Sequence, residues 1–177
     1  MDIAGLLNNK AIKSTEKRSI ISDAIQLGSL TIQDIQALKG ALDDPKMALI
    51  LEAMEAITGK HPEAADLHWL TFTQAFISSP SNSIKRETSR IVGNIAHLFP
   101  NNLEAAIQKL LVNTSEEGSV IRWSSAYALS RIVSIPQYAT SELFDMILAL
   151  YERETDNGIK NQYLNGLKKA RKIRNIP

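Results

Sequence analysis

The sequence predicts an all-α protein in which helical hairpins pack in series. Apolar residues recur at spacings of three and four almost everywhere, and no stretch alternates with period two for long enough to form a strand. In addition, one apolar pattern returns about every 37 residues, which is typical of repeat architectures. With 177 residues, 44% of them hydrophobic, the chain can bury a sizeable core in one domain.

Helix starts are marked by capping residues and by proline. A short turn fits residues 2–8, ahead of the first full helix. Residues 31–34, Thr-Ile-Gln-Asp, form a capping box, and residues 101–104, Asn-Asn-Leu-Glu, resemble one. Pro45 and Pro62 each suit the first turn of a helix, where the missing amide hydrogen costs nothing.

Helix ends are marked by Gly59, Pro80, Pro100, Pro136 and Gly158. Because the connections are only a few residues long, neighbouring helices should form antiparallel hairpins. The expected helices are 14–28, 31–42, 45–58, 62–78, 83–98, 102–113, 120–134, 140–154 and 159–173.

Composition excludes several classes of protein. The chain has no cysteine, so it has no disulfide, no thiolate nucleophile and no Cys-ligated metal cluster. Its 20 Lys and Arg balance 19 Asp and Glu, which excludes a generally polybasic binder of nucleic acid or membrane. We find no signal-peptide pattern and no run of about 18 apolar residues, and we therefore expect a soluble, cytoplasmic protein without membrane contact.

One apolar frame repeats along the chain. Starting at Ile84, apolar or small residues occupy the first, fifth, eighth, ninth and twelfth positions, and the frame returns at Ile121 and, weakened, at Ile159. Moving 38 residues back from Ile84 leads to Lys46, where four of the five positions are kept. Two residues before each start stands a favoured N-cap, which supports the register. These N-cap candidates are Asp44, Asn82, Ser119 and Asn157.

The segments IKRETSRIVGNI (84–95) and IRWSSAYALSRI (121–132) resemble the second helix of HEAT repeats, in which an aliphatic residue is followed by a cation, small residues and another aliphatic residue. The resemblance covers about 31–173 and is weakest in the first unit, which has Met47 in place of the cation. It implies a right-handed α-α superhelix, a solenoid of about four HEAT-like hairpins used mainly as a scaffold. The implied parts are an N-terminal helical cap at 1–30 and hairpins at 31–60, 61–98, 99–136 and 137–177, all in one continuous domain.

The cations Lys85, Arg122 and Lys160 share the second frame position, near the start of their helices. The helix dipole disfavours a cation there by about 0.3–1 kcal/mol, so a compensating contact is expected. The resemblance favours a structural ladder from each repeat to a neighbouring turn. Alternatively, cations beside helix N-termini form an anion site. The candidate ladder partners are Asp44, Asn82, Glu117 and Asp156.

Frame positions 3, 7, 10 and 14 lie opposite the predicted core and would line the concave surface of a solenoid. Along the four units this face is acidic, basic, aromatic and again basic. Its residues are Ala48, Glu52, Glu55 and Gly59, then Arg86, Arg90, Gly93 and His97, then Trp123, Tyr127, Ser130 and Ser134, and finally Asn161, Asn165, Lys168 and Lys172.

Trp123 and Tyr127, four residues apart, should stack about 10 Å from Arg86 and Arg90, one helix-packing distance away. Trp, Tyr and Arg supply most binding hot spots, so this combination predicts a recognition surface. Two structural alternatives remain: Trp123 lies in the core under a neighbouring helix, or the aromatic rings pack on the arginine stems as a cation–π cluster. The predicted partner-binding residues are Arg86, Arg90, His97, Trp123, Tyr127, Asn161, Asn165 and Lys168.

No catalytic, phosphate-loop or metal-binding motif occurs, and no cofactor is expected. The sequence therefore predicts a non-catalytic adaptor that docks an acidic or extended segment of a protein partner. The alternative is a nucleic-acid-binding module related to the HEAT-like alkylpurine DNA glycosylases, which combine aromatic residues, cations and a carboxylate. Glycosylase activity is not expected, because Glu52 and Glu55 should lie two repeats from the aromatic pair, about 20 Å away. The basic residues 168–174 are interpreted as a solvated helix whose cations complement its C-terminal end, or alternatively as an extension of the nucleic-acid surface that tracks phosphates.

Overall fold

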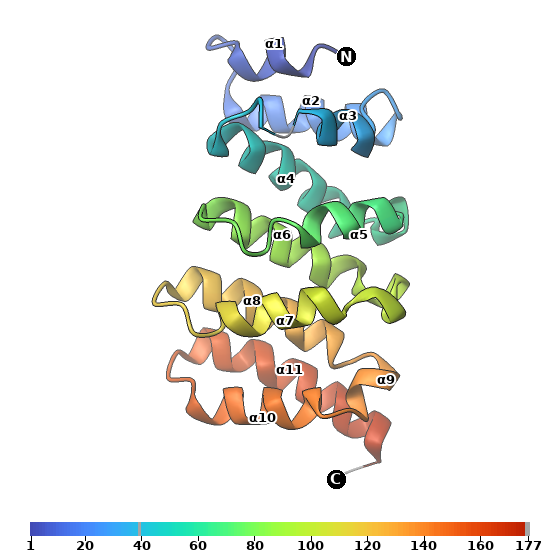
Figure 1. Ribbon diagram of the computed structural model, residues 1–177, viewed down its shortest axis with the longest axis vertical. Coiled ribbons are helices and arrows are strands. Elements are labelled where there is room, and N and C mark those ends of the chain that lie inside the picture. Colours follow the sequence, from blue (N-terminus) through green and yellow to red (C-terminus); the bar gives the residue numbers. More distant parts are fainter. Residues whose placement is uncertain (39, 176–177) are drawn as a thin grey trace.

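The computed structural model describes residues 1–38 and 40–175, which form helices and turns and contain no strand. Antiparallel helix pairs follow one another along the long axis of the molecule, from the N-terminus at one end to the C-terminus at the other (Figure 1). The all-α prediction is therefore confirmed. The α-helices are α1 (Ile3–Asn8), α2 (Ser14–Gln26), α3 (Ile32–Ala37), α4 (Asp44–Thr58), α5 (Leu67–Gln74), α6 (Asn82–Ile95), α7 (Glu104–Asn113), α8 (Ser119–Ile132), α9 (Pro136–Ala139), α10 (Leu143–Arg153) and α11 (Asn157–Arg174), and the 3-10 turns are η1 (Pro62–Ala64), η2 (Ala96–Leu98) and η3 (Pro100–Asn102).

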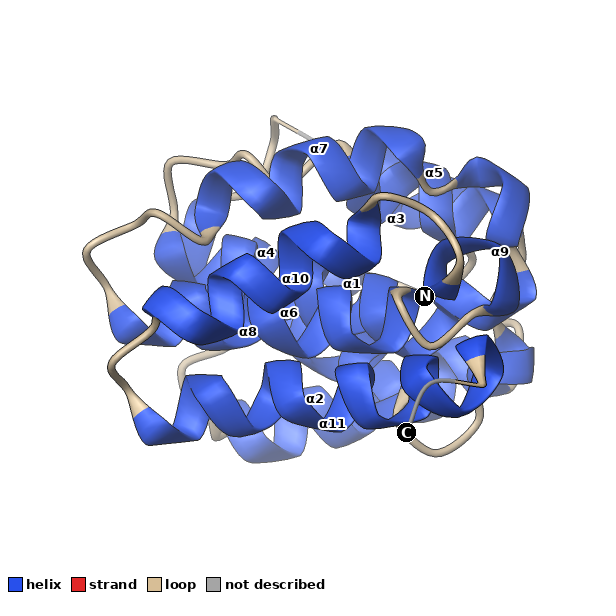
Figure 2. Cartoon of the chain, turned by 90° about the horizontal axis from the view of Figure 1, so that it is seen from below, coloured by secondary structure: helices blue, strands red, loops and turns tan. Residues whose placement is uncertain are grey.

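Two layers of helices enclose the core. In one layer α2, α4, α6, α8 and α11 contact each other in that order, and the other helices pack against them, as α5 does on α6, α7 on α8 and α10 on α11. The connecting turns gather at the two ends of the helices (Figure 2). One hydrophobic core runs through the whole stack, from Ile3 to Ala170. No helix in the described part of the chain is long and apolar enough to cross a membrane.

The repeated frame predicts the core correctly. In α6, α8 and α11 all five frame positions are buried, and in α4 the four positions that keep the pattern are buried as well. Each of these helices therefore presents the same face to the core, in phase with the next. The buried frame residues are Ile50, Ala53, Met54 and Ile57, Ile84, Thr88, Ile91, Val92 and Ile95, Ile121, Ser125, Ala128, Leu129 and Ile132, and Ile159, Tyr163, Gly166, Leu167 and Ala170.

The predicted N-caps are wrong by one residue in all four helices. Asp44, Asn82, Ser119 and Asn157 are the first helical residues, and the caps precede them. In α4 and α11 the capping carboxylate is visible: Asp43 accepts a hydrogen bond from the Lys46 amide, and Asp156 accepts one from the Ile159 amide, each at 3.0 Å. Since the shift is the same throughout, the phase of the repeat is unchanged. The caps are Asp43, Ser81, Gly118 and Asp156.

Several of the expected helices are shorter or broken. The capping box at Thr31 and Asp34 forms as predicted, but α3 ends at Ala37, and Lys39 lies outside the described residues. The helix expected over 62–78 is divided, because Asp66 is the N-cap of a separate helix, α5. Its carboxylate accepts hydrogen bonds from the amides of the two residues after Leu67. The helix expected over 140–154 is likewise preceded by the separate α9 at 136–139.

Two glycines allow the closest helix contacts. A Cβ on Gly93 would lie 2.9 Å from Ala128 Cα, and one on Gly166 would lie 2.5 Å from the Ser130 carbonyl oxygen. Because real Cβ contacts are longer, α6, α8 and α11 can approach this closely only where one helix carries no side chain. Gly93 and Ser130, expected on the open face, are therefore buried under the next helix.

Candidate partner-binding face

Trp123 and Tyr127 stack as the sequence predicts. Their ring centroids are 5.5 Å apart and their planes differ by 19°. Both residues are half-buried, and Trp123 packs against the edge of the core. The Arg131 guanidinium lies 4.4 Å from the Tyr127 ring centroid, so the pair continues into a cation–π contact on the same helix. Trp123 is thus neither a fully exposed platform nor a core residue.

The Tyr127 hydroxyl anchors this pair to the interior. It donates a hydrogen bond of 2.5 Å to Asn94 Oδ1, and Asn94 Nδ2 donates one of 3.2 Å to Thr58 Oγ1. The Thr58 hydroxyl in turn donates to the Met54 carbonyl at 3.0 Å. Burial raises the pKa of Tyr127, although the Arg131 charge opposes this, so the phenol stays neutral and keeps donating. Asn94 and Thr58 are buried, and this series of hydrogen bonds therefore links the open face of α8 to α6 and α4.

The arginines of α6 are paired with carboxylates rather than free. Arg86 Nη2 lies 3.3 Å from Glu52 Oε1, and Arg90 Nη2 lies 2.8 Å from Glu55 Oε1. Glu87, whose side chain is only 2% exposed, contacts both: Arg86 Nε on one oxygen, and Arg90 Nη1 at 3.4 Å on the other. Charge-assisted contacts of this kind hold both guanidinium groups in place.

The sequence prediction considered Glu52 and Glu55 only relative to the aromatic pair, and the structure shows them paired with the arginines. Glu52 and Glu55 lie beside the arginines, and Glu87, which the frame did not single out, is buried between them. Arg18 of α2 completes the group, with its Nη1 at 4.0 Å from Glu52 Oε2. Three guanidinium groups thus face three carboxylates, and the network has no net charge.

A pocket of about 310 Å³ opens beside Trp123, between α6 and the N-terminal ends of α8 and α11. Val120 and Ile159 supply aliphatic surface, and Val120 is 55% exposed although it is apolar. Sequence reasoning missed Val120 because this residue lies off the frame, and it assigned Ile159, a frame position, to the core, whereas the pocket is formed where two helices begin. An apolar residue in the first turn but off the core frame was the available signal. The lining residues are Arg86, Arg90, Ser119, Val120, Trp123, Asp156 and Ile159.

Five of the eight predicted partner-binding residues are not part of this pocket. His97 is exposed in η2, after the end of α6. The α11 residues among them are exposed: Asn161, Asn165 and Lys168. Tyr127 stacks on Trp123 but does not line the pocket. At the acidic end Ala48 is buried, contrary to the prediction. Of the eight predicted partner-binding residues, the pocket therefore unites Arg86, Arg90 and Trp123.

The cations near the helix starts occupy the fourth helical position, one residue later than the frame predicts. Lys85 pairs with Glu116, in the turn of the next hairpin. Arg122 pairs with Glu154 in the turn after that, at 3.2 Å from Nε to Oε2, and also donates to the carbonyls of Glu116 and Glu117. These contacts have the ladder geometry: Glu116 and Glu154 are the ion-pair partners, and of the candidates only Glu117 takes part, through its carbonyl.

Lys160, in the hairpin of α10 and α11, contacts an aromatic ring instead. Its ammonium group lies 4.9 Å from the centroid of the Tyr151 ring, so the compensating contact is cation–π. Within residues 1–38 and 40–175, no group of three or more His, Asp or Glu side chains is arranged to hold a metal ion.

Comparison with known proteins is informative only for the fold. No protein family model matches the chain, and no curated protein matches it. Among solved structures, the chain is similar to the crystal structure of an engineered protein determined by the Northeast Structural Genomics Consortium, with a TM-score of 0.56 and 14% sequence identity over 98% of both chains. At this identity the similarity concerns the fold alone.

Proposed function

We propose that this chain is a HEAT-like helical solenoid, a right-handed superhelix that acts as a non-catalytic scaffold and binds an extended segment of a partner protein. The in-phase burial of the frame in α4, α6, α8 and α11 supports the repeat assignment. The capping of the stack by residues 1–30 and its four hairpin units are parts of the same proposal. Extended surfaces made by such stacks commonly serve in binding.

The pocket beside Trp123 is the observation that carries the binding proposal. A half-buried Trp, an exposed Val120 and Ile159 form a hollow of about 310 Å³, the lower end of the range for ligand pockets. Buried aromatic and Arg residues around a small cavity are typical of hot spots. We infer that the partner inserts one bulky apolar side chain here.

The charge balance decides which kind of segment fits. Arg86 and Arg90 each contact two carboxylates, so an acidic partner would compete with Glu52, Glu55 and Glu87 for them. Asp156 adds another negative charge at the pocket. Of the two partner types that the sequence allows, acidic or extended, the balance favours an extended segment with an apolar anchor.

The nucleic-acid alternative gains no support from this geometry. Phosphate binding requires unpaired cations, and the arginine network is neutral. Tyr127 lies along α8 between Trp123 and Arg131 and contacts both, so little of its ring remains for a base. A short single-stranded oligonucleotide should therefore leave the Trp fluorescence unchanged at low salt. Quenching that weakens steeply with added salt would instead establish the alternative.

The experiment is a selection of peptides from a random display library on the immobilised protein, followed by affinity measurement with synthetic peptides. We expect selected peptides to share a bulky apolar residue. Val120→Asp should weaken their binding at least tenfold, because it places a charge on the pocket wall. The matched control is Val112→Asp on α7, where Val112 is 72% exposed and outside the pocket.

Both valines are exposed, so neither variant should lower the thermal midpoint by much. Equal peptide affinity in the two variants would refute the pocket as the anchor. Failure of the library to give any peptide that binds the protein would refute the binding proposal itself.

A further inference from the structure

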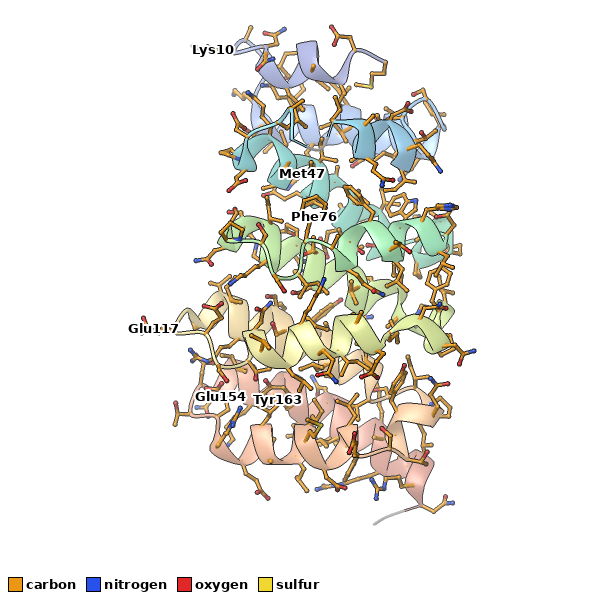
Figure 3. All side chains as sticks on the ribbon, viewed as in Figure 1. Lys10, Met47, Phe76, Glu117, Glu154 and Tyr163 are labelled. Carbon is orange, nitrogen blue, oxygen red and sulfur yellow. The ribbon has the colours of Figure 1, made fainter. Side chains whose placement is uncertain are left out.

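A second pocket, of about 360 Å³, lies on the turns that connect α7 to α8 and α10 to α11. It shares no lining residue with the pocket beside Trp123. Figure 3 labels two of its residues, Glu154 and Tyr163, in the lower part of the stack. Polar groups dominate its wall: Ser115, Arg122, Arg153, Glu154, Thr155 and Tyr163.

Tyr163 is the unusual residue of this pocket. It occupies the fifth frame position of the last hairpin, where the two middle hairpins have the small residues Thr88 and Ser125. Its side chain is almost fully buried, at 1% exposed, and lines the pocket. Within residues 1–38 and 40–175 its hydroxyl has no protein hydrogen-bond partner, whereas the Tyr127 and Tyr138 hydroxyls each donate one hydrogen bond. Its oxygen is not among the fully buried polar atoms without a partner in this part of the chain, which belong to Ser89, Arg90 and Ser125, so it reaches the pocket and is free to donate to a group that enters.

The hydroxyl of Tyr163 remains a donor at neutral pH. Burial raises the pKa of this phenol well above its usual value, and the Glu154 charge raises it further, against the opposing charges of Arg153 and Arg122. All three charged side chains are therefore near enough to the phenol to act on it. A neutral phenol beside two guanidinium groups can donate its proton to an anionic oxygen.

Positive charge exceeds negative charge on the pocket wall by one. Glu154 is fully engaged: Oε2 pairs with Arg122 Nε at 3.2 Å, and Oε1 accepts hydrogen bonds from the amides of Thr155 and Asp156, each at 3.0 Å. This leaves Arg153, which is exposed and makes no ion pair or hydrogen bond within residues 1–38 and 40–175. The carboxylate therefore does not compete for Arg153.

We propose that this pocket binds a phosphate group, held by Arg153 and the Tyr163 hydroxyl with help from Arg122 and the hydroxyls of Ser115 and Thr155. The Arg153 guanidinium, Nη2 of Arg122 and three hydroxyls offer more donors than the two oxygens of a carboxylate can accept, whereas phosphate has oxygens enough for all of them. The inference does not depend on the proposed partner surface, because the two pockets share no residue.

The first test is a titration of the whole protein with inorganic phosphate at constant ionic strength, in which NMR measures the amide chemical shifts at each step. We expect saturable shifts at Ser115, Thr155 and Tyr163. A parallel titration with O-phosphoserine distinguishes the source of the group: tighter binding than inorganic phosphate indicates a phosphorylated side chain, and equal binding indicates the free ion. Linear, non-saturating shifts with both probes would overturn the proposal.

The second test uses variants that keep the fold. Tyr163→Phe removes only a hydroxyl without a protein partner, so the thermal midpoint should be unchanged while phosphate affinity falls tenfold or more. Tyr151→Phe is the matched control, since Tyr151 lies on α10 outside the pocket and should bind phosphate normally.

Arg153→Gln tests the charge independently of the buried tyrosine and should also weaken binding at least tenfold. Its control is Arg171→Gln, which makes the same change of net charge near the end of α11. Equal affinity in Tyr163→Phe and in the unaltered protein, or in Arg153→Gln and Arg171→Gln, would show that phosphate does not bind at these groups.

Discussion

Gly166→Ala is the most direct test of the packing between the last two hairpins. The new Cβ would lie 2.5 Å from the Ser130 carbonyl oxygen and 2.6 Å from Ser130 Cα. Carbon atoms pack at about 3.5–4.0 Å, so α11 would have to move from α8 by roughly 1 Å. Overpacking costs about 1–3 kcal/mol, and the upper end applies because the obstructing atoms are backbone. Alanine regains about 1 kcal/mol through its helix propensity, which leaves a net loss of about 2 kcal/mol.

Urea unfolding followed by circular dichroism measures this loss, and a thermal scan should show a midpoint lower by roughly 4–8 °C for a chain of this size. Gly158→Ala is the control, because it is the same substitution on the same helix. Its Cβ would meet only the side-chain oxygen of Asp156, at 3.1 Å. The control should be neutral or slightly stabilising. If Gly166→Ala were stabilising by the same amount, α8 and α11 could not be this close, and the in-phase stacking would be wrong.

Three further predictions concern the two pockets and their supports. Tyr127→Phe leaves Asn94 Oδ1 buried without its donor, so urea unfolding should show a loss of about 1–3 kcal/mol, and a loss below 0.5 kcal/mol would contradict the hydrogen-bonded chain. Burial alone would raise the pKa of Glu154, but hydrogen bonds from two amides and Arg122 leave this pKa below its usual 4.5. The unfolded state therefore binds more protons than the folded state. As a result, the stability that Glu154→Gln lacks at pH 7 should vanish as the pH falls below about 4.5. A destabilisation by Glu154→Gln that does not change with pH would contradict this sign. With Trp69 replaced by Phe, the half-buried Trp123 should emit at an intermediate wavelength and be partly quenched by iodide, whereas a fully blue-shifted, unquenched emission would place it in the core.

The core was predictable because the repeat supplies several copies of the same constraint. An aliphatic residue at Ile84 alone says little, but its return at Ile121 and Ile159 fixes which face of each helix is buried. Helix boundaries were less accurate, since capping depends on local backbone geometry. Gly118, for example, caps α8 without a side chain, and no pattern of polar residues could have identified it.

The pocket was only partly predictable because the frame describes single helices, whereas the cavity depends on how far apart they lie. Gly93 and Gly166 allow such close approach that residues expected on the open face are covered, Ser130 among them. The same approach brings Ile159 of α11 up to Trp123 of α8. A sequence pattern contains the spacing along each helix but not the distance between helices.

The arginine pair shows why a face cannot be assigned a charge from one helix. Arg86 and Arg90 form a basic stripe when α6 is considered alone, and an acidic partner follows from that. The carboxylates that neutralise them come from two places: the preceding hairpin, through Glu52 and Glu55, and α6 itself, through the buried Glu87. Removing the two arginines would leave the charge of the buried Glu87 carboxylate uncompensated, which would destabilise the fold. The arginines are therefore parts of the framework that shapes the pocket, and the specificity of the pocket must come from its apolar wall.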